Sequence, residues 1–440
     1  MDTMNYPVQV TGDLLGLPFP TSIESLIEQG PEFLTLAFRA SGALSEDNRV
    51  TAINTLEEFF AGGMGRKLLL SVQYEKPSED LHTELFLKFP RDFGDPLREL
   101  FSPLMEPEIR FALLSRQPGF PVAVPKCYFA DYHAASSSGL LVTEKIRFGQ
   151  DGIEPVYDKC QDYELPDPLA HYKALTQALA RISGAHKAGR LDADADVHYP
   201  HDAKSASTMN RIPYTPSELE AKLDYLRGFI DRVPQLFPES LRCQAFLTRF
   251  SQQAPLILEH EHAIREYLNS NSDYVALCHW NANIDNAWFW KSEQGTLQAG
   301  LLDWGSVGQM NIAQALFGMI CAAETEFLDA HKQDLLHLFV AEYQHNGGPA
   351  IDAGTLALHL KLAIATLGIA WMLDAPALIE AQIPEIETVL GRHDPRLKND
   401  FLARAQLHLL IVFLNEWQTG NIGELIPLFL SMQGKGDEPG

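Results

Sequence analysis

The sequence predicts an α+β protein of two lobes, in which a lobe built mainly on an antiparallel sheet precedes a larger, largely helical lobe. Three observations predict this fold class. Short apolar or alternating runs, separated by glycine and charged turns, fill residues 50 to 89 and return between 125 and 146. From 165 to about 430, apolar residues recur at helical spacing instead. Strand-like runs reappear in that helical part only around a polar loop, between 271 and 305.

The first elements of the chain are a helix and a meander of strands. Residues 22–43 carry apolar residues at helical spacing, and the interruption at Gly30-Pro31 predicts one or two short helices. The runs VTAINTLEEFF, LLLSVQYE and TELFLKFP then predict three strands, because each is short and is bounded by glycine, proline or charged residues.

One helix and two further strands complete the sheet lobe. Residues 96–116 predict a helix with breaks near Pro103 and Pro107. The runs PKCYFADYH and GLLVTEKI predict two strands joined by the turn AASSSG. A helix predicted over 169–189 opens the helical lobe, with Gly189 where a C-terminal cap is expected.

These patterns define the expected domains. We expect an N-terminal helical extension over 1–45, the sheet lobe with one major helix over 46–147, and the helical lobe over 148–440, which carries a strand-containing insert at 271–305. A protein of two lobes binds its ligand between them by default, so a cleft is expected there.

The composition argues against several functional classes. Hydrophobic residues make up 46% of the 440 residues and charged residues 21%, as in ordinary globular proteins. The net charge of −24, from 34 basic and 58 acidic residues, argues against binding nucleic acid or an anionic membrane through a general positive field. Any anionic ligand must therefore be held by a few local donors.

The cysteines and the apolar segments indicate a soluble protein of the cytoplasm. The five cysteines are odd in number and widely spaced, without a CxxC, so neither a disulfide framework nor a zinc site is predicted. The N-terminus has no basic region followed by an apolar run, which a secretory signal would have. Apolar stretches such as 407–414 fall far short of the roughly 20 residues of a membrane-spanning helix.

Several polar residues match the parts that phosphoryl transfer from ATP requires. These parts are a lysine on the phosphates, carboxylate and amide oxygens on Mg²⁺, and a group that orients the acceptor hydroxyl. The segment AGGMGRK, between two predicted strands, is the first candidate, because backbone N–H groups at Gly62, Gly63 and Gly65 can approach phosphate oxygens. A glycine cluster between strands is also a common hairpin turn, and that alternative stays open.

Lys88 is the candidate for the phosphate-binding lysine. It ends the strand-like run TELFLK, and a solvated lysine at a sheet edge is the alternative interpretation. We expect Glu108, on the helix that follows, to hold the Lys88 ammonium through an ion pair. Glu99 and Glu106 compete for this role, but the end of the helix that carries Glu108 has an apolar side from which Glu108 projects.

The strand GLLVTEKI joins the two predicted lobes. Its backbone from Thr143 through Glu144 to Lys145 is a candidate to pair with an adenine edge. A buried strand that simply ends in a linker is the alternative.

The loop CHWNANIDN has the spacing of a phosphotransferase catalytic loop. In the pattern H-x-D-x-x-x-x-N, the Asp orients the attacking hydroxyl and accepts its proton, and the Asn oxygen binds magnesium. Here the pattern runs from His279 to Asn286, and Asn281 fills the Asp position. Asp303, in LLDWG, follows a predicted strand as a second metal ligand would. We expect His279 to shape the loop rather than to catalyse, and Asp285 to act near the metal rather than as a base.

On these motifs the sequence resembles the aminoglycoside phosphotransferase and choline kinase-like superfamily, including its ecdysteroid kinase-like branch. The resemblance runs from roughly 35 to 330, and EIRFALLSRQPGFPVAVPKCYFADYH, CHWNANIDN and LLDWGSVG carry it. It implies a protein-kinase-like fold with a five-stranded first lobe, ATP and Mg²⁺ between the lobes, and a small-molecule hydroxyl as acceptor. Under this resemblance Lys88 contacts the α- and β-phosphates, Glu108 pairs with Lys88, and Asn286 and Asp303 hold Mg²⁺.

Two departures from the HGDxHxxN that members of this superfamily usually show matter for the chemistry. Trp280 replaces a glycine, which suggests either an apolar wall at the acceptor site or core packing beside Trp288 and Trp290. Asn281 replaces the catalytic Asp. An amide still positions a hydroxyl but takes no proton, and general-base help is worth about 10²–10⁴-fold, whereas positioning and electrostatics carry most of phosphoryl transfer.

We therefore expect an ATP- and Mg²⁺-dependent phosphotransferase that acts on a hydroxyl of a small molecule, with Asn281 positioning the acceptor. The alternative is a nucleotide-binding pseudokinase that senses or scaffolds, and a weaker third hypothesis is nucleotidyl transfer on the same fold. No nucleic acid and no membrane is expected as a partner. The sequence predicts neither the acceptor nor the oligomeric state.

Overall fold

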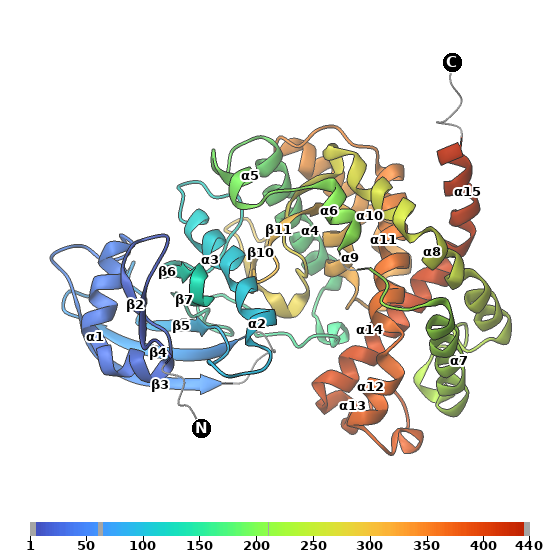
Figure 1. The fold of residues 1–440 in the computed structure, drawn as a ribbon, viewed down its shortest axis with the longest axis horizontal. Coiled ribbons are helices and arrows are strands. Elements are labelled where there is room, and N and C mark those ends of the chain that lie inside the picture. Colours follow the sequence, from blue (N-terminus) through green and yellow to red (C-terminus); the bar gives the residue numbers. More distant parts are fainter. Residues whose placement is uncertain (1–5, 60–64, 210, 435–440) are drawn as a thin grey trace. The chain divides into compact units, whose positions relative to one another are not determined.

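The computed structural model describes residues 6–59, 65–209 and 211–434, and the chain divides into two compact units (Figure 1). Unit 1 consists of Met1–Pro155, Gly189–Tyr199 and Gly300–Gly308, and unit 2 of Val156–Ala188, Pro200–Ala299 and Gln309–Gly440. The α+β fold class is confirmed, because an antiparallel sheet lies in the N-terminal part and the remainder is largely helical. The predicted domain boundaries, which are continuous along the chain, stay a prediction.

Unit 1 is built on an antiparallel sheet of five strands in the order β3-β4-β5-β7-β6. Its strands are β3 Val50–Phe59, β4 Arg66–Tyr74, β5 Glu84–Phe89, β6 Cys127–His133 and β7 Ser138–Glu144. The other elements of unit 1 are β1 Gln9–Thr11, β2 Pro18–Pro20, α1 Ile23–Ala40, α2 Arg98–Phe101, α3 Met105–Leu114 and α5 Ala195–His198. The meander predicted from the sequence is therefore confirmed.

Helix α1 covers one face of this sheet. The buried side chains of Phe33, Leu34 and Phe38 join alternate strand residues such as Leu68 and Leu87 in a common core. Since side chains alternate along a strand, the residues between these point to the opposite face. The helix is kinked at Gly30, as its sequence predicts.

Helix α3 packs on the opposite face, against β6 and β7. Its Met105 and Ile109 contact Tyr132 of β6 and Leu141 of β7 in a second core cluster. The predicted helix over 96–116 is broken near Pro103, where a 3-10 turn separates α2 from α3. The second predicted break, at Pro107, is wrong, because this proline lies in the first turn of α3, where backbone N–H groups have no partner within the helix.

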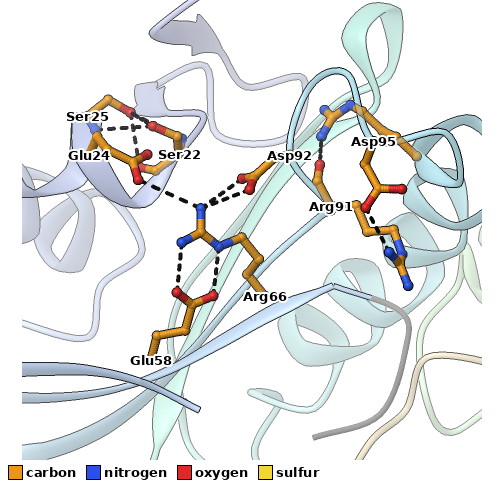
Figure 2. Close-up of polar contacts among 9 residues, drawn as sticks. Ser22, Glu24, Ser25, Glu58, Arg66, Arg91, Asp92 and Asp95 are labelled. Carbon is orange, nitrogen blue, oxygen red and sulfur yellow. Dashed lines mark hydrogen bonds and ion pairs between the residues drawn. The ribbon is translucent and has the colours of Figure 1, made fainter. Parts of the chain in front are cut away.

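The start of β4 is held to its surroundings by Arg66. The guanidinium contacts Glu58 of β3 at 2.7 Å and Asp92 at 2.8 Å, and it lies 3.8 Å from Glu24 in the first turn of α1 (Figure 2). Arg66 thus points to the face that α1 covers, and its charge is met by three carboxylates. Its neighbour Lys67 must point to the opposite face.

Unit 2 is largely helical. Its longer helices are α4 Pro168–Lys187, α7 Pro216–Arg232, α8 Gln244–Ser270, α10 Thr325–His345, α11 Ala353–Met372, α14 Phe401–Thr419 and α15 Ile422–Gly434. Its shorter helices are α6 Ala203–Thr208, α9 Ile312–Ile320, α12 Ala375–Gln382 and α13 Pro395–Asn399. Helix α4 ends one residue before Ala188, and Gly189 follows with φ 64°, as a C-terminal cap requires.

Helix α11 is the most apolar long helix. By length and composition it could cross a membrane, but 67% of its most apolar window is buried within the protein, as in the core helix of a soluble protein. It contacts α8, α9, α10, α14 and α15. Its neighbours therefore cover most of the apolar surface of this helix.

Short strands flank the polar loop of unit 2, as expected. β8 Val275–Cys278 precedes the loop and pairs with β11 Gly308–Asn311, while β9 Ala287–Lys291 follows the loop and pairs with β10 Leu297–Leu301. Every residue of β8 is buried. The loop between β8 and β9 is therefore anchored at both ends.

Candidate functional site

In unit 1, Lys88 is buried in a cluster of charged side chains. Only 3% of the residue is exposed, which excludes the interpretation of Lys88 as a solvated edge lysine. Its Nζ donates to Glu108 Oε2 at 2.6 Å and to Asp303 Oδ1 at 3.3 Å. The ion pair predicted with Glu108 is thus present, whereas Glu106 pairs with Arg110 one turn further along α3.

Helix α3 also explains why Asp303 lies beside Lys88. Glu108 and Phe111 are three residues apart, so they share a face of the helix. Trp304 stacks on the Phe111 ring with centroids 3.8 Å apart, and its Nε1–H donates to Leu301 O at 3.0 Å. One helix face therefore holds the Lys88 ammonium and fixes the residue next to Asp303.

Asp303 itself has an unusual backbone conformation. Its φ is 54°, in the left-handed region that side chains other than glycine rarely adopt. The segment before it is held by a parallel bridge between Ala123 and Gly300 and by a hydrogen bond from Leu301 N–H to Ala123 O at 3.0 Å. Such backbone strain persists where the surroundings enforce it, and it is frequent at functional sites. The Asp303 side chain remains 41% exposed.

The charges of the cluster define what it can bind. Burial disfavours the Lys88 ammonium, but the carboxylates of Glu108 and Asp303 outweigh burial and raise the pKa of Lys88 above its ordinary value. Lys88 is therefore charged at neutral pH. A fixed ammonium beside an exposed carboxylate can receive an anion at the first group and a divalent cation at the second.

The sheet face that carries Lys88 becomes apolar along the strands. Leu69 of β4 is paired with Phe86 of β5, and Phe86 with Thr143 of β7, so the three side chains share this face. Leu69 and Phe86 are half-buried. The face thus offers an apolar surface for a flat ring close to a cationic end, which is what a nucleotide requires.

The other predicted nucleotide-binding residues lie around this face or outside the described residues. Gly62 and Gly63 lie outside the described residues. At Gly65 a Cβ atom would lie 2.3 Å from Phe89 O, so the close approach of two strands already requires glycine there. A role of these glycines on phosphates stays a prediction.

The segment from Thr143 to Lys145 is engaged in the sheet. The N–H of Glu144 donates to Lys126 O at 2.9 Å and the N–H of Lys145 donates to Glu84 O at 3.1 Å. An adenine edge would therefore have to use other backbone atoms of this segment, and the predicted contact stays a prediction.

In unit 2, the loop after β8 is organised by its own backbone and by asparagines. The N–H of Asn281 donates to His279 Nδ1 at 3.2 Å, which supports the predicted structural role of His279. The Asn286 side chain donates through Nδ2 to Asn281 O at 3.0 Å. This bond leaves Asn286 Oδ1 as the oxygen for another partner, which fits a metal ligand. The hydrogen bonds of Asn281 within the described loop use its backbone, and its side chain is half-exposed.

Asn283 and Lys159 support this loop, and sequence analysis assigned neither of them a role. Asn283 is fully buried and its Nδ2 donates to Met319 O at 3.1 Å and to Gly318 O, while its Oδ1 accepts from Lys159 Nζ at 2.5 Å. Lys159 also lies 3.7 Å from Asp285. The clue in the sequence was a third asparagine in the loop, but its partners are distant along the chain.

Gly318 lets the loop lie directly on α9. A Cβ atom at this position would lie 1.7 Å from Trp280 O. The Trp280 ring packs edge to face on Trp371 of α11, with centroids 5.1 Å apart, whereas Trp288 and Trp290 stack on each other. The half-exposed Trp280 and Trp371 thus form an aromatic surface next to Asn281.

The predicted metal ligands belong to different units, Asp303 to unit 1 and Asn286 to unit 2, so their joint role stays a prediction. Each fits Mg²⁺ by chemistry, as an exposed carboxylate and an amide oxygen. Within the described part of the chain, no group of three or more His, Cys, Asp or Glu side chains is arranged to hold a metal ion.

Comparisons with known proteins place small-molecule kinases among the similar structures. No family model matches the chain, and no curated protein matches it. Choline kinase from Cryptosporidium parvum Iowa II is 12% identical with a TM-score of 0.41, over 86% of this chain and 93% of that chain. A microcompartment-associated aminopropanol kinase is 14% identical with a TM-score of 0.42, over 89% and 98% of the two chains.

A spectinomycin phosphotransferase in complex with ADP and spectinomycin is also similar, at 14% identity and a TM-score of 0.37, over 83% of this chain and 94% of that chain. These structures come from the superfamily that the sequence resembles.

Proposed function

We propose that this protein is an ATP- and Mg²⁺-dependent phosphotransferase that acts on a hydroxyl of a small molecule. The observation that carries the proposal is the buried ion pair of Lys88 and Glu108 beside the exposed carboxylate of Asp303. Phosphoryl transfer needs a fixed cation for phosphate oxygens next to an oxygen ligand for the metal. A purely structural ion pair would have no need of the exposed, strained carboxylate at its side.

Each residue then has one task. Lys88 contacts the α- and β-phosphates, and Glu108 keeps its ammonium in position. Asp303 and Asn286 supply oxygens to Mg²⁺, which when bound neutralises charge on the transferring phosphoryl group. The segment 143–145 stays the candidate for the adenine edge. The half-buried sheet face beside it supports that part of the proposal.

In the proposal, Asn281 positions the acceptor hydroxyl. Its amide oxygen can accept a hydrogen bond from the hydroxyl but cannot take the proton, so transfer is slower than with a carboxylate. Trp280 and Trp371 give this position an aromatic neighbour, which favours an acceptor that is partly apolar. The five cysteines are free thiols, which fits action in the reducing cytoplasm.

The asparagine at 281 also favours a second function. A pseudokinase that binds nucleotide and senses or scaffolds needs Lys88 and the metal ligands but no base. The two functions share nucleotide binding and differ only in turnover.

Titration calorimetry with MgATP tests the nucleotide site. We expect the wild-type protein to bind MgATP, and Lys88→Met and Asp303→Asn each to weaken binding by about 10-fold or more, because each removes a charged partner. Lys76→Met is the control, since Lys76 pairs at the surface with exposed Asp47. A wild-type protein that binds no MgATP would contradict both functions.

ATP turnover over a panel of amino sugars, amino alcohols, sterols and acyl alcohols separates the two functions. If the protein is a phosphotransferase, we expect one class of acceptor to stimulate ATP turnover and Asp303→Ala to abolish that turnover. Binding of MgATP without turnover on any acceptor would favour the pseudokinase.

A further inference from the structure

A second lysine lies beside Asp303, on the strand next to Lys88. Lys67 of β4 is directly opposite Lys88 of β5 in the antiparallel pairing, so the two side chains share a face of the sheet. Lys67 Nζ lies 4.0 Å from Asp303 Oδ2, while Lys88 Nζ lies 3.3 Å from Asp303 Oδ1. Two ammonium groups therefore flank one carboxylate.

The two lysines are held differently. Lys88 has a close partner in Glu108 at 2.6 Å, in addition to Asp303. For Lys67 the 4.0 Å separation from Asp303 is too long for a hydrogen bond. Within residues 6–59, 65–209 and 211–434, Lys67 Nζ makes no closer polar contact. Its side chain is nevertheless only 13% exposed.

Lys67 also differs from its chain neighbour Arg66, which shows what a structural cation looks like at this edge of the sheet. Arg66 is met by Glu58, Asp92 and Glu24 on the other face (Figure 2). For Lys67, burial is the largest influence and lowers the pKa below its ordinary value, against the attraction of Asp303. A mostly buried ammonium without a hydrogen-bonded partner costs free energy that an incoming anion would offset.

The chain as a whole repels anions, since its net charge is −24. An anionic ligand must therefore be bound by donors gathered at one place. Lys67 and Lys88 are such a pair, and the half-buried Leu69 and Phe86 continue their face.

We propose that Lys67 is a second phosphate-binding lysine, which together with Lys88 holds the phosphate chain of a nucleoside triphosphate beside Asp303. This inference rests on the proposed function, because it uses the same face of the sheet. Lys88, fixed by Glu108, provides a cation in a set position. Lys67 provides three N–H donors, and no carboxylate in the described residues lies close enough to accept from them.

Calorimetric titrations of ATP, tripolyphosphate and adenosine into the wild-type protein and Lys67→Met test the inference. We expect Lys67→Met to weaken ATP and tripolyphosphate by about 10- to 100-fold, the range for a hydrogen bond to a charged group. Adenosine binding should not change, because Lys67 acts on phosphate. Lys67→Arg, which keeps the charge, should recover most of the ATP affinity.

Lys76→Met is the matched control, because Lys76 follows the same strand and pairs only with exposed Asp47 in the described residues. It should leave all three affinities unchanged. Thermal unfolding of each variant checks that Lys67→Met remains folded, and Lys67→Gln replaces it otherwise.

Two results would overturn the inference alone. If Lys67→Met lost affinity for ATP and for adenosine by the same factor, Lys67 would only support the fold. If Lys67→Met kept the wild-type affinity for ATP, Lys67 would not bind phosphate. If the wild-type protein bound neither ATP nor adenosine, that result would contradict both the proposed function and this inference.

Discussion

Replacing Glu108 by glutamine should destabilise unit 1. The Lys88 and Glu108 side chains are 4% and 7% exposed, and their charged atoms are 2.6 Å apart. Removing one partner of a buried ion pair costs about 3–5 kcal/mol. Because Lys88 keeps Asp303 at 3.3 Å, we expect the lower end of that range, about 3 kcal/mol.

Native-state hydrogen exchange of the α3 and β5 amides measures this loss, since it reports the free energy of opening for a single segment. Glu106→Gln, two residues earlier in α3, is the matched control. Glu106 and its partner Arg110 are 34% and 26% exposed, so this variant should cost less than about 1 kcal/mol. If the two variants changed the opening free energy equally, the Lys88–Glu108 pair would not be the buried interaction described above.

Three further predictions concern unit 2. Gly318→Ala should push the Trp280 carbonyl away from α9 and destabilise the protein by about 1–3 kcal/mol or more in urea unfolding. Gly228→Ala in α7 is the control. Its added Cβ atom would meet its nearest neighbour at 3.5 Å, so this variant should stabilise the protein by about 0.5–1 kcal/mol. Lys159→Met should increase hydrogen exchange in the loop 279–286 by about 10-fold or more, because it removes the hydrogen bond to Asn283. Burial lowers the pKa of His359 to about 4, so its contribution to stability should be complete above about pH 6.5 and fall by about 3 kcal/mol as pH drops toward 4.

The sign of the last prediction follows from proton binding. The unfolded chain takes up a proton on His359 below about pH 6.5 while the folded protein does not, so acid favours unfolding. Urea unfolding of His359→Gln should therefore depend less on pH in this window than the wild type does. An unchanged pH dependence would contradict it. If Gly318→Ala were as stable as the wild type, the loop would not depend on its contact with α9. If the loop of Lys159→Met exchanged its amide hydrogens at the wild-type rate, the loop would not depend on Lys159.

The fold class and the Lys88–Glu108 pair could be predicted because they depend on local pattern. Alternation along β4 and β5 and the apolar spacing of α3 are visible in the sequence, and Glu108 projects from a helix that follows the Lys88 strand. Lys67 could not be predicted, because its place beside Asp303 depends on the register between β4 and β5 and on a segment more than two hundred residues away.

The residues that support the loop between β8 and β9 could not be predicted either, because their partners are distant along the chain. In the sequence, Asn283 looks like an ordinary polar residue of the loop. Only the structure shows that its side chain forms hydrogen bonds with α9 and with Lys159. The break expected at Pro107 failed because a proline in the first turn of a helix removes no hydrogen bond. The contact between Trp280 and Trp371 of α11 could not be predicted either, because the two residues lie far apart in the sequence.

Transfer of labelled γ-phosphate from ATP to a hydroxylated acceptor, by the wild type and by Asn281→Asp, tests the central claim most directly. Since the hydrogen bonds of Asn281 within the described loop use its backbone, the substitution of its side chain should leave the structure of the loop intact. We expect slow transfer by the wild type and an increase in kcat of about 10²-fold or more in Asn281→Asp, because a carboxylate can accept the hydroxyl proton. MgATP binding without phosphate transfer by either protein would contradict the phosphotransferase.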